Sequence, residues 1–328
     1  MYILAFETSC DDTSIAIFKD GNLIALDTKS QIKEHNVTKG VVPEVAARLH
    51  ANNIFFVLEN VLDMASLKIE EMDYIVCTEK PGLLPSLLVG LTVAKTLAKT
   101  LNKPFILIDH IKAHIFANLL ERDLTELVFP SICLTVSGGH NEIYLWKSLF
   151  ELELVGETLD DSAGESFDKV SKMMGMEYPG GPIISKLAKQ YDGEFRSIFP
   201  TVLLEKNSLD FSFSGLKSAV KREIDRRIIE KGSLSDEDRI EISFEFETTV
   251  IEILKYKIFK AAERYGIRSL VLAGGVSAND KLKNEISKKA QEYGYSFIHP
   301  KKGIYSQDNA AMVAILAYYM IINNKKSF

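Results

Sequence analysis

The hydrophobic and polar positions of this chain divide it into short apolar runs and longer amphipathic stretches. Short runs bounded by polar or glycine-containing turns predict strands, and apolar residues recurring every three or four positions predict helices. In the first part we expect strands at 2–9, 13–19, 23–28, 74–78 and 105–108, and helices at 43–63 and 86–101. The predicted order is therefore three strands, helix, strand, helix, strand, with a helical segment after it.

The same order begins again near residue 132. Here we expect strands at 132–136, 142–146, 150–155, 270–273 and 297–298, and helices at 162–175, 215–231, 235–265, 279–293 and 308–322. No visible sequence repeat accompanies this recurrence, so it indicates a duplicated topology. We predict an α/β protein of two domains: 1–109 with a C-terminal helix at about 305–328, and 110–304 with a helical insertion at about 160–265.

Composition narrows the class of protein. The 328 residues are 46% hydrophobic and 26% charged, which is enough apolar material for a sizeable core. The net charge of -6 argues against a surface that is basic throughout, but a local nucleic-acid patch stays open. The three cysteines follow no metal-ligand spacing, the N-terminus lacks the basic region of a signal peptide, and no long apolar run suggests a membrane span. We therefore expect a cytoplasmic protein.

Two glycine-rich turns are candidates for binding a phosphate or ribose. The sequence 137–140 reads SGGH between two predicted strands, and 274–279 reads GGVSAN between a strand and a helix. Glycine lets the backbone approach a ligand closely, and the amides at a helix N-terminus attract anions. Tight turns alone would also explain the glycines, but several such turns in one duplicated frame favour a nucleotide site.

His110 and His114 are four residues apart, which places both imidazoles on one face of a helix, close enough to share a metal ion. A chance pair at this spacing is expected in roughly one such sequence in ten, so coincidence stays open. A metallopeptidase is excluded, because Ile111 stands where its general-base glutamate would follow the first histidine.

With these motifs placed, the chain resembles the universal tRNA threonylcarbamoyl-adenosine transferase family, called TsaD in bacteria, over nearly its whole length. The matching motifs are FETSCDDT at 6–13, GVVPEVAAR at 40–48, DHIKAH at 109–114, VSGGH at 136–140, GESFDK at 164–169, YPGGP at 178–182, FSFSGLK at 211–217, GGVSAN at 274–279 and DNAAM at 308–312. The resemblance implies the duplicated, RNase H-like two-domain fold of actin, sugar kinases and Hsp70, with a central cleft.

The resemblance also implies a metal site and a substrate site. Asp308 would complete a metal site with the two histidines, although taken alone it would also serve as a helix N-cap. Fe²⁺ is the favoured ion, and Zn²⁺ suits the same ligands. The implied substrate-binding residues are Thr135, Val136, Ser137, Gly138, Gly139, Asp168, Gly181, Ser185 and Asn279.

For two of the implied substrate-binding residues, Asp168 and Ser185, the sequence also offers another interpretation. The Asp168 carboxylate suits ribose hydroxyls, but an ordinary ion pair with Lys172 is an alternative role for it. Ser185 departs from the family, which often has an aspartate there, so a ribose contact at this position is in doubt.

The implied reaction transfers a threonylcarbamoyl group from threonylcarbamoyl-adenylate to N6 of adenosine 37 in tRNAs that read ANN codons, which forms t6A and releases AMP. Alignment and charge neutralisation would carry most of the catalysis, since an aromatic amine is a weak nucleophile. Asp11 is our candidate general base, and a turn-stabilising role is equally compatible with its position. The alternatives are a small-molecule kinase or ATPase of the same superfamily, and a non-catalytic nucleotide-binding scaffold, which would be expected to lose the histidine pair.

The partners follow from the resemblance only. They are a TsaB-like paralogous subunit, a TsaE-like P-loop ATPase, tRNA, and a TsaC-like synthase that supplies the adenylate. The amphipathic run 45–62 is a candidate helix face for the paralogous subunit, although core packing explains such a pattern as well. Lysines are spread along the chain, so the sequence indicates no tRNA surface.

Overall fold

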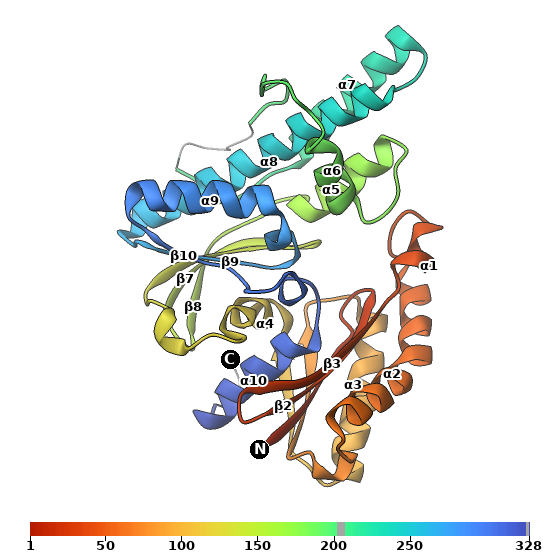
Figure 1. Cartoon of the computed structure of the whole chain (residues 1–328), viewed down its shortest axis with the longest axis vertical. Coiled ribbons are helices and arrows are strands. Elements are labelled where there is room, and N and C mark those ends of the chain that lie inside the picture. The colour runs from red at the N-terminus through yellow and green to blue at the C-terminus, as the bar shows by residue number, and fades with distance from the viewer. Residues whose placement is uncertain (202–206, 326–327) are drawn as a thin grey trace. The chain divides into compact units, whose positions relative to one another are not determined.

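The strands expected from the apolar runs form two five-stranded sheets, one in each of two units (Figure 1). The computed structural model describes residues 1–201, 207–325 and 328. Unit 1 consists of Met1–Leu127 and Pro300–Phe328, and unit 2 of Val128–His299.

The sheet of unit 1 has the strand order β3-β2-β1-β4-β5. Its strands are β1 (Tyr2–Glu7), β2 (Asp12–Lys19), β3 (Asn22–Ser30), β4 (Tyr74–Lys80) and β5 (Phe105–Asp109). The first three are antiparallel neighbours, whereas β4 pairs parallel with both β1 and β5.

Both faces of this sheet are covered by helices. Leu4 and Phe6 belong to a buried cluster with side chains of α2 (Pro43–Ala65) and α3 (Leu84–Thr100). Side chains alternate along a strand, so Ile3 and Ala5, which are also fully buried, face the opposite side. There α10 (Ala310–Ile322) contacts β1 and β2, and α4 (His110–Phe116) packs against α10. Burial on both faces explains the nearly continuous apolar run at the N-terminus.

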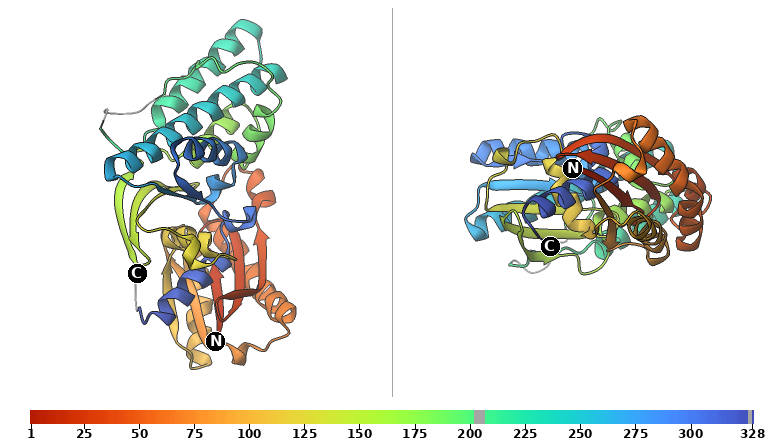
Figure 2. Two further views of the ribbon diagram at one scale, coloured as in Figure 1. Left: turned by 60° about the vertical axis from the view of Figure 1, so that its left-hand side comes forward. Right: turned by 90° about the horizontal axis from the view of Figure 1, so that it is seen from below.

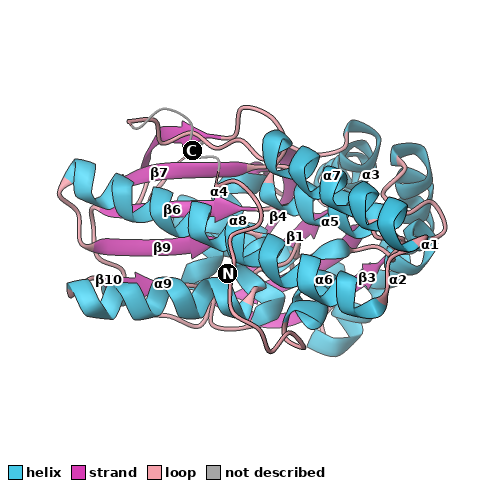
Figure 3. Cartoon of the chain, turned by 90° about the horizontal axis from the view of Figure 1, so that it is seen from above, coloured by secondary structure: helices cyan, strands magenta, loops and turns pink. Residues whose placement is uncertain are grey.

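Unit 2 repeats this topology. Its strands are β6 (Ser131–Val136), β7 (Asn141–Ser148), β8 (Glu151–Glu157), β9 (Ser269–Ala273) and β10 (Ser296–Ile298). Their order is β10-β9-β6-β7-β8, which matches unit 1 strand for strand when β6 is aligned with β1 (Figure 3). The predicted duplication is confirmed.

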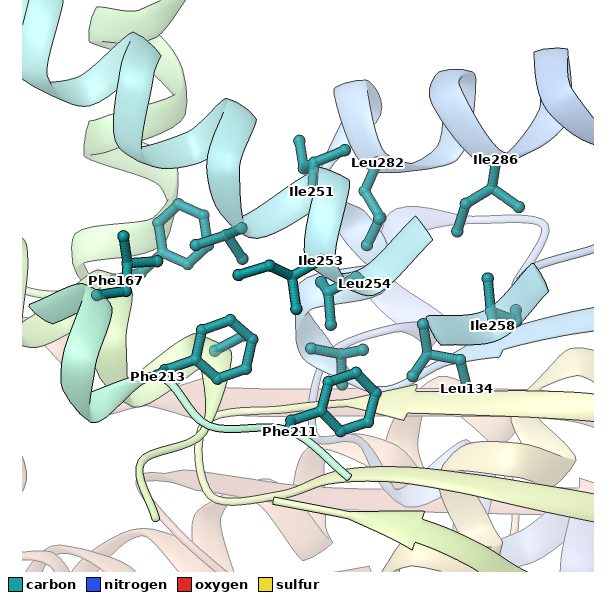
Figure 4. Close-up of a cluster of buried hydrophobic side chains, with 14 of the residues drawn as sticks. Leu134, Phe167, Phe211, Phe213, Ile251, Ile253, Leu254, Ile258, Leu282 and Ile286 are labelled. Atoms are coloured by element: carbon teal, nitrogen blue, oxygen red, sulfur yellow. The ribbon is translucent and has the colours of Figure 1, made fainter. Parts of the chain in front are cut away.

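A helical segment lies between β8 and β9. It contains α5 (Ala163–Met173), α6 (Gly180–Ala188), α7 (Ser214–Lys231) and α8 (Asp236–Tyr265), and α9 (Asp280–Tyr293) follows β9. Helix α8 runs beside α9 and extends beyond the sheet towards α7 (Figures 1 and 2). The core of unit 2 joins these helices to the sheet, because Phe211 and Phe213 lie close to Ile253 of α8 and Leu134 of β6 (Figure 4).

Two helices and one boundary differ from the sequence-based expectation. Helix α1 (Ile32–Asn36) is little more than one turn, and α6 begins with two glycines, which are weak helix formers, so neither produces a clear periodic pattern. We expected the second domain to begin at residue 110, but α4 packs on α10 and residues 110–127 therefore belong to unit 1. Within the described residues, no helix combines the length and the apolar character that crossing a membrane requires.

Candidate functional site

The histidine pair lies on a short buried helix that directly follows β5. Asp109 starts α4 as its N-cap, since its Oδ1 accepts a hydrogen bond from Lys112 N at 3.0 Å. The rings of His110 and His114 are arranged edge to face with centroids 4.6 Å apart, as expected for residues four apart on one helix face. His114 is fully buried and His110 is 8% exposed.

Asp308 joins the pair from the segment before α10. Its Oδ1 lies 3.0 Å from His114 Nε2 and 3.6 Å from His110 Nε2. The alternative N-cap role of Asp308 is wrong, because Asn309 caps α10 by accepting a hydrogen bond from Met312 N at 3.1 Å. The predicted helix start at 308 therefore moves to Ala310.

These three side chains can hold a metal ion. Each offers one ligand atom, and the three atoms lie within 4.8 Å of one another. Two imidazoles and one carboxylate are a donor set that suits a divalent transition metal and leaves further coordination positions for substrate or water.

A second layer of polar residues, which the sequence analysis did not identify, orients His110. Glu7 is fully buried at the end of β1, and its Oε2 lies 3.1 Å from His110 Nδ1. Ser9 N donates to Glu7 Oε1 at 2.6 Å, Thr78 Oγ1 donates to Oε2 at 2.5 Å, and Ser9 Oγ lies 3.3 Å from His110 Nδ1. Hydrogen bonding at Nδ1 directs the other ring nitrogen, Nε2, toward Asp308.

The electrostatics of this cluster favour a positive charge between the carboxylates. Burial lowers the pKa of His110, but Asp308 and Glu7 outweigh it and raise that pKa to about 9. Burial raises the pKa of Asp308, yet the two histidines bring it down to about 2. The pKa of Glu7 is also lowered, mainly by His110 acting against burial. The same negative charge would favour a metal cation in place of that proton, so the residues fit a metal.

Asp11 lies in the turn between β1 and β2. Its carbonyl accepts a hydrogen bond from Gln31 N at 3.1 Å, which ties this turn to the residue after β3. Burial and the neighbouring Asp11 carboxylate raise the pKa of Asp12 to about 7. These observations leave the role of Asp11 as a general base a prediction.

In unit 2 five of the predicted substrate residues, 135–139, lie at the end of β6 and in the turn that follows it. Thr135 and Val136 end that strand and are fully buried. Gly138 and Gly139 are exposed and have no positive φ, and a Cβ built on either would meet no atom within 4 Å. Gly181 in α6 is half-buried, and it too has no positive φ and would meet no atom within 4 Å with a Cβ. Neither conformation nor packing requires glycine at these three positions, so their role in approaching a ligand stays a prediction.

Three further glycines bring neighbouring elements against this turn. A Cβ on Gly164 of α5 would lie 2.5 Å from Ser137 O, and one on Gly274 would lie 2.4 Å from Val136 O. A Cβ on Gly180 of α6 would lie 2.4 Å from the backbone of α5. The first turn of α5 and the turn after β9 are thereby held close to the end of β6 and the turn that follows it, and the start of α6 is held against the middle of α5.

Asp168 and Asn279 have defined positions in this arrangement. Asp168 Oδ1 accepts a hydrogen bond from Gly180 N at 2.7 Å, which ties α5 to the start of α6. Asn279 is the N-cap of α9, since its Oδ1 accepts from Leu282 N at 2.9 Å. We call the set of Ser137, Gly138, Gly139, Asp168, Gly181, Ser185 and Asn279 the turn cluster.

Ser185 contacts a second residue that the sequence analysis missed, Glu247 of α8. Ser185 Oγ donates to Glu247 Oε1 at 2.6 Å, and Asn279 Nδ2 donates to Ser185 Oγ at 3.0 Å and to Glu247 Oε1 at 2.7 Å. Glu247 is 3% exposed. The doubtful position 185 therefore lies beside a buried carboxylate that comes from another helix.

Solved structures share this architecture. The activator of the 2-hydroxyisocaproyl-CoA dehydratase from Clostridium difficile aligns with a TM-score of 0.53 at 14% identity, over 99% of this chain and 97% of that one. HypF from T. kodakarensis aligns with a TM-score of 0.63 at 13% identity, over 98% of this chain and 48% of HypF. At such identities the likeness concerns the fold alone.

Sequence relatives are much closer. A relative from Kosmotoga olearia named tRNA N6-adenosine threonylcarbamoyltransferase is 44% identical over 319 residues, which cover 97% of this chain and 93% of the relative. A relative of the same name from Mycoplasma capricolum is 41% identical over 326 residues, 99% of this chain and all of the relative. The family model described as "TsaD: tRNA N6-adenosine threonylcarbamoyltransferase" matches residues 22–315. The chain therefore belongs to the TsaD family of tRNA N6-adenosine threonylcarbamoyltransferases.

Proposed function

We propose that this protein transfers the threonylcarbamoyl group from threonylcarbamoyl-adenylate to N6 of adenosine 37 in tRNAs that read ANN codons, forming t6A and releasing AMP. The observation that carries the proposal is the 44% identity, over 97% of the chain, to a relative named for this activity. The His110, His114 and Asp308 cluster supports it, because a scaffold that had lost catalysis would have no need to keep three converging ligands.

In the proposed reaction N6 attacks the carbamoyl carbonyl, a carbon–nitrogen bond forms, and the bond from that carbon to the phosphate oxygen breaks. The N6 proton must leave, and Asp11 is the proposed acceptor. The turn cluster binds the adenylate: the amides and open glycines of 137–139 approach the phosphate, while Asp168, Gly181, Ser185 and Asn279 lie around the adenosine. Thr135 and Val136 hold this turn from the buried end of β6.

The metal ligands in this proposal are His110, His114 and Asp308, with Fe²⁺ favoured and Zn²⁺ as the alternative. When bound, the ion would supply Lewis acidity toward phosphate or threonyl oxygens. Glu7 and Ser9 keep the His110 ring oriented, which preserves Nε2 as a ligand atom. A superfamily kinase or ATPase is not favoured, because Mg²⁺ prefers oxygen ligands to imidazoles.

The proposed partners are a TsaB-like subunit, a TsaE-like ATPase, tRNA and a TsaC-like synthase, all in the cytoplasm. The surface of α2 and α3 supports a helical partner. Ile54 and Val57 of α2 are buried in the core, whereas Phe55 and Leu88 are 57% and 51% exposed. Both line an apolar groove between the two helices, together with Ala51, Ile54, Val89, Thr92 and Val93. The paralogous subunit is the proposed occupant of this groove.

The test is a reconstitution. Purified protein is combined with the three protein partners, tRNA, threonine, bicarbonate and ATP, and modified adenosine is measured in digested tRNA by mass spectrometry. We expect t6A with the wild-type chain and none with H110A. ATP hydrolysis that yields no t6A, with all components active in control reactions, would contradict the proposal.

A further inference from the structure

The contacts of Glu247 leave one carboxylate oxygen available beside the turn cluster. Both hydrogen bonds that it accepts, from Ser185 Oγ and Asn279 Nδ2, fall on Oε1. No described residue donates to Oε2, and this oxygen is not among the fully buried side-chain atoms without a partner. Oε2 is therefore a charged acceptor that solvent or a ligand can still reach, on a side chain that is itself 3% exposed.

The neighbouring side chains have already used their hydrogen-bonding groups. Asn279 donates through Nδ2 to two acceptors and accepts at Oδ1 from Leu282 N. The Ser185 hydroxyl donates its one proton to Glu247. Among these three side chains, Glu247 has the strongest unused capacity to accept a hydrogen bond.

Glu245 on the same helix shows what a purely structural carboxylate looks like in this chain. It is fully buried, and its Oε1 and Oε2 each accept a hydrogen bond from a backbone amide, Arg196 N at 2.7 Å and Ile198 N at 3.2 Å. Both oxygens of Glu245 are thus occupied within the protein. Glu247 differs because two donors fix Oε1 and orient the group while Oε2 stays open.

We propose that Glu247 accepts hydrogen bonds from the ribose hydroxyls of the bound adenylate, with Ser185 and Asn279 positioning it; this rests on the proposed function. A carboxylate suits a ribose diol because an oxygen with two lone pairs can accept from both hydroxyls. Serine at position 185, where an aspartate is often expected, also avoids placing two carboxylates against each other. The carboxylate for the ribose thus comes from Glu247 of α8 instead of from position 185 of α6.

The experiment measures binding of AMP and of 2′,3′-dideoxy-AMP by equilibrium dialysis. Glu247→Gln retains Oε1 as an acceptor for Ser185 and Asn279 and changes only the group at Oε2. The wild-type protein should prefer AMP over the dideoxy analogue by about 10- to 100-fold, and E247Q should reduce this ratio to about 1–3 by weakening AMP alone. The control E252Q, a half-exposed glutamate of the same helix that pairs with Lys255, should keep the wild-type ratio.

Three results would overturn the assignment: no hydroxyl preference in the wild-type protein, no AMP binding at all, or equal weakening of both nucleotides in E247Q. The first two need no variant, so a misfolded E247Q does not prevent the test. The t6A assay on the wild-type protein distinguishes failure of the ribose contact from failure of the proposed reaction. Formation of t6A with an unchanged ratio in E247Q rejects the role of Glu247 alone, whereas a changed ratio without t6A rejects the proposed reaction and keeps the ribose contact.

Discussion

Replacing Glu7 with glutamine should weaken the metal site without touching a metal ligand. Gln keeps an acceptor for Ser9 N but presents an amide N–H group to His110 Nδ1 and Thr78 Oγ1, which both rely on Glu7 Oε2 as an acceptor. His110 then loses the hydrogen bond that fixes its ring orientation and the negative charge behind it. Because Glu7 is fully buried, water cannot replace either contribution.

The magnitude follows from the pKa of His110. Its increase from 6.5 to about 9 corresponds to about 3 kcal/mol in favour of a positive charge on the ring: burial opposes the increase, and Asp308 first and Glu7 second outweigh it. Removal of a carboxylate behind a ligating histidine usually lowers metal affinity 10- to 100-fold, about 1.4–2.8 kcal/mol, which is less than the whole of that shift. We expect E7Q to lose metal affinity within that range.

The assay is competition with a chelator of known affinity on anaerobically purified protein, followed by elemental analysis. The matched control is Glu79→Gln, on an exposed glutamate of β4, which should keep the wild-type affinity. Thermal unfolding of the metal-free proteins shows whether the variants fold. Unchanged metal affinity in a folded E7Q would refute the role assigned to Glu7.

Three further predictions concern the ligands, the turn cluster and the helical segment. His114→Ala should abolish metal content and t6A formation together, and full metal retention by the purified variant would reject the ligand assignment. Gly138→Ala should leave the melting temperature unchanged, because its Cβ meets nothing within 4 Å, but weaken AMP binding by roughly tenfold, as dialysis would show. Arg227→Met should destabilise unit 2 by about 2–3 kcal/mol in urea, since buried Asp238 loses its 2.8 Å ion pair with Arg227 and keeps only the one with Lys231, while R226M should have little effect. Burial raises the folded-state pKa of Asp238, but hydrogen bonds from Lys231, Ser235 and Arg227 outweigh it and lower that pKa. The stability that Asp238 contributes is therefore present above pH of about 4 and declines as the pH falls through the folded value, so the R227M deficit should shrink in acid.

The sequence predicted most of the fold because both sheets are built from apolar runs with clear limits. It also predicted the histidine pair, since spacing along one helix is a local property. Asp308 came only from the resemblance, because 194 residues separate it from His114 and no local pattern joins them. Glu7 could have been inferred, as a carboxylate at the end of a buried strand needs a partner.

Glu247 could not be recognised in the same way. Helix α8 spans 30 residues and carries many acidic side chains, so its sequence gives no reason to select one of them. What distinguishes Glu247 is its contact with Ser185 and Asn279, which lie 62 and 32 residues away along the chain. Such a carboxylate becomes visible only when the hydrogen bonds of α6, α8 and α9 are known.

The duplicated topology explains why the two candidate sites differ in chemistry. The turn after β1 in unit 1 and the turn after β6 in unit 2 occupy equivalent places in the two sheets. Each is contacted by a glycine that follows the neighbouring parallel strand: a Cβ on Gly82 would lie 2.7 Å from Ser9 O, and one on Gly274 2.4 Å from Val136 O. In unit 1 the turn is flanked by carboxylates, which favour a cation, whereas unit 2 has open glycines and no carboxylate between 137 and 140, which suits the proposed phosphate contact. The same arrangement of strand, turn and supporting glycine thus occurs beside different side chains in the two units: in unit 1 it lies next to Glu7, which contacts His110 of α4, and in unit 2 it carries the open glycines 138 and 139.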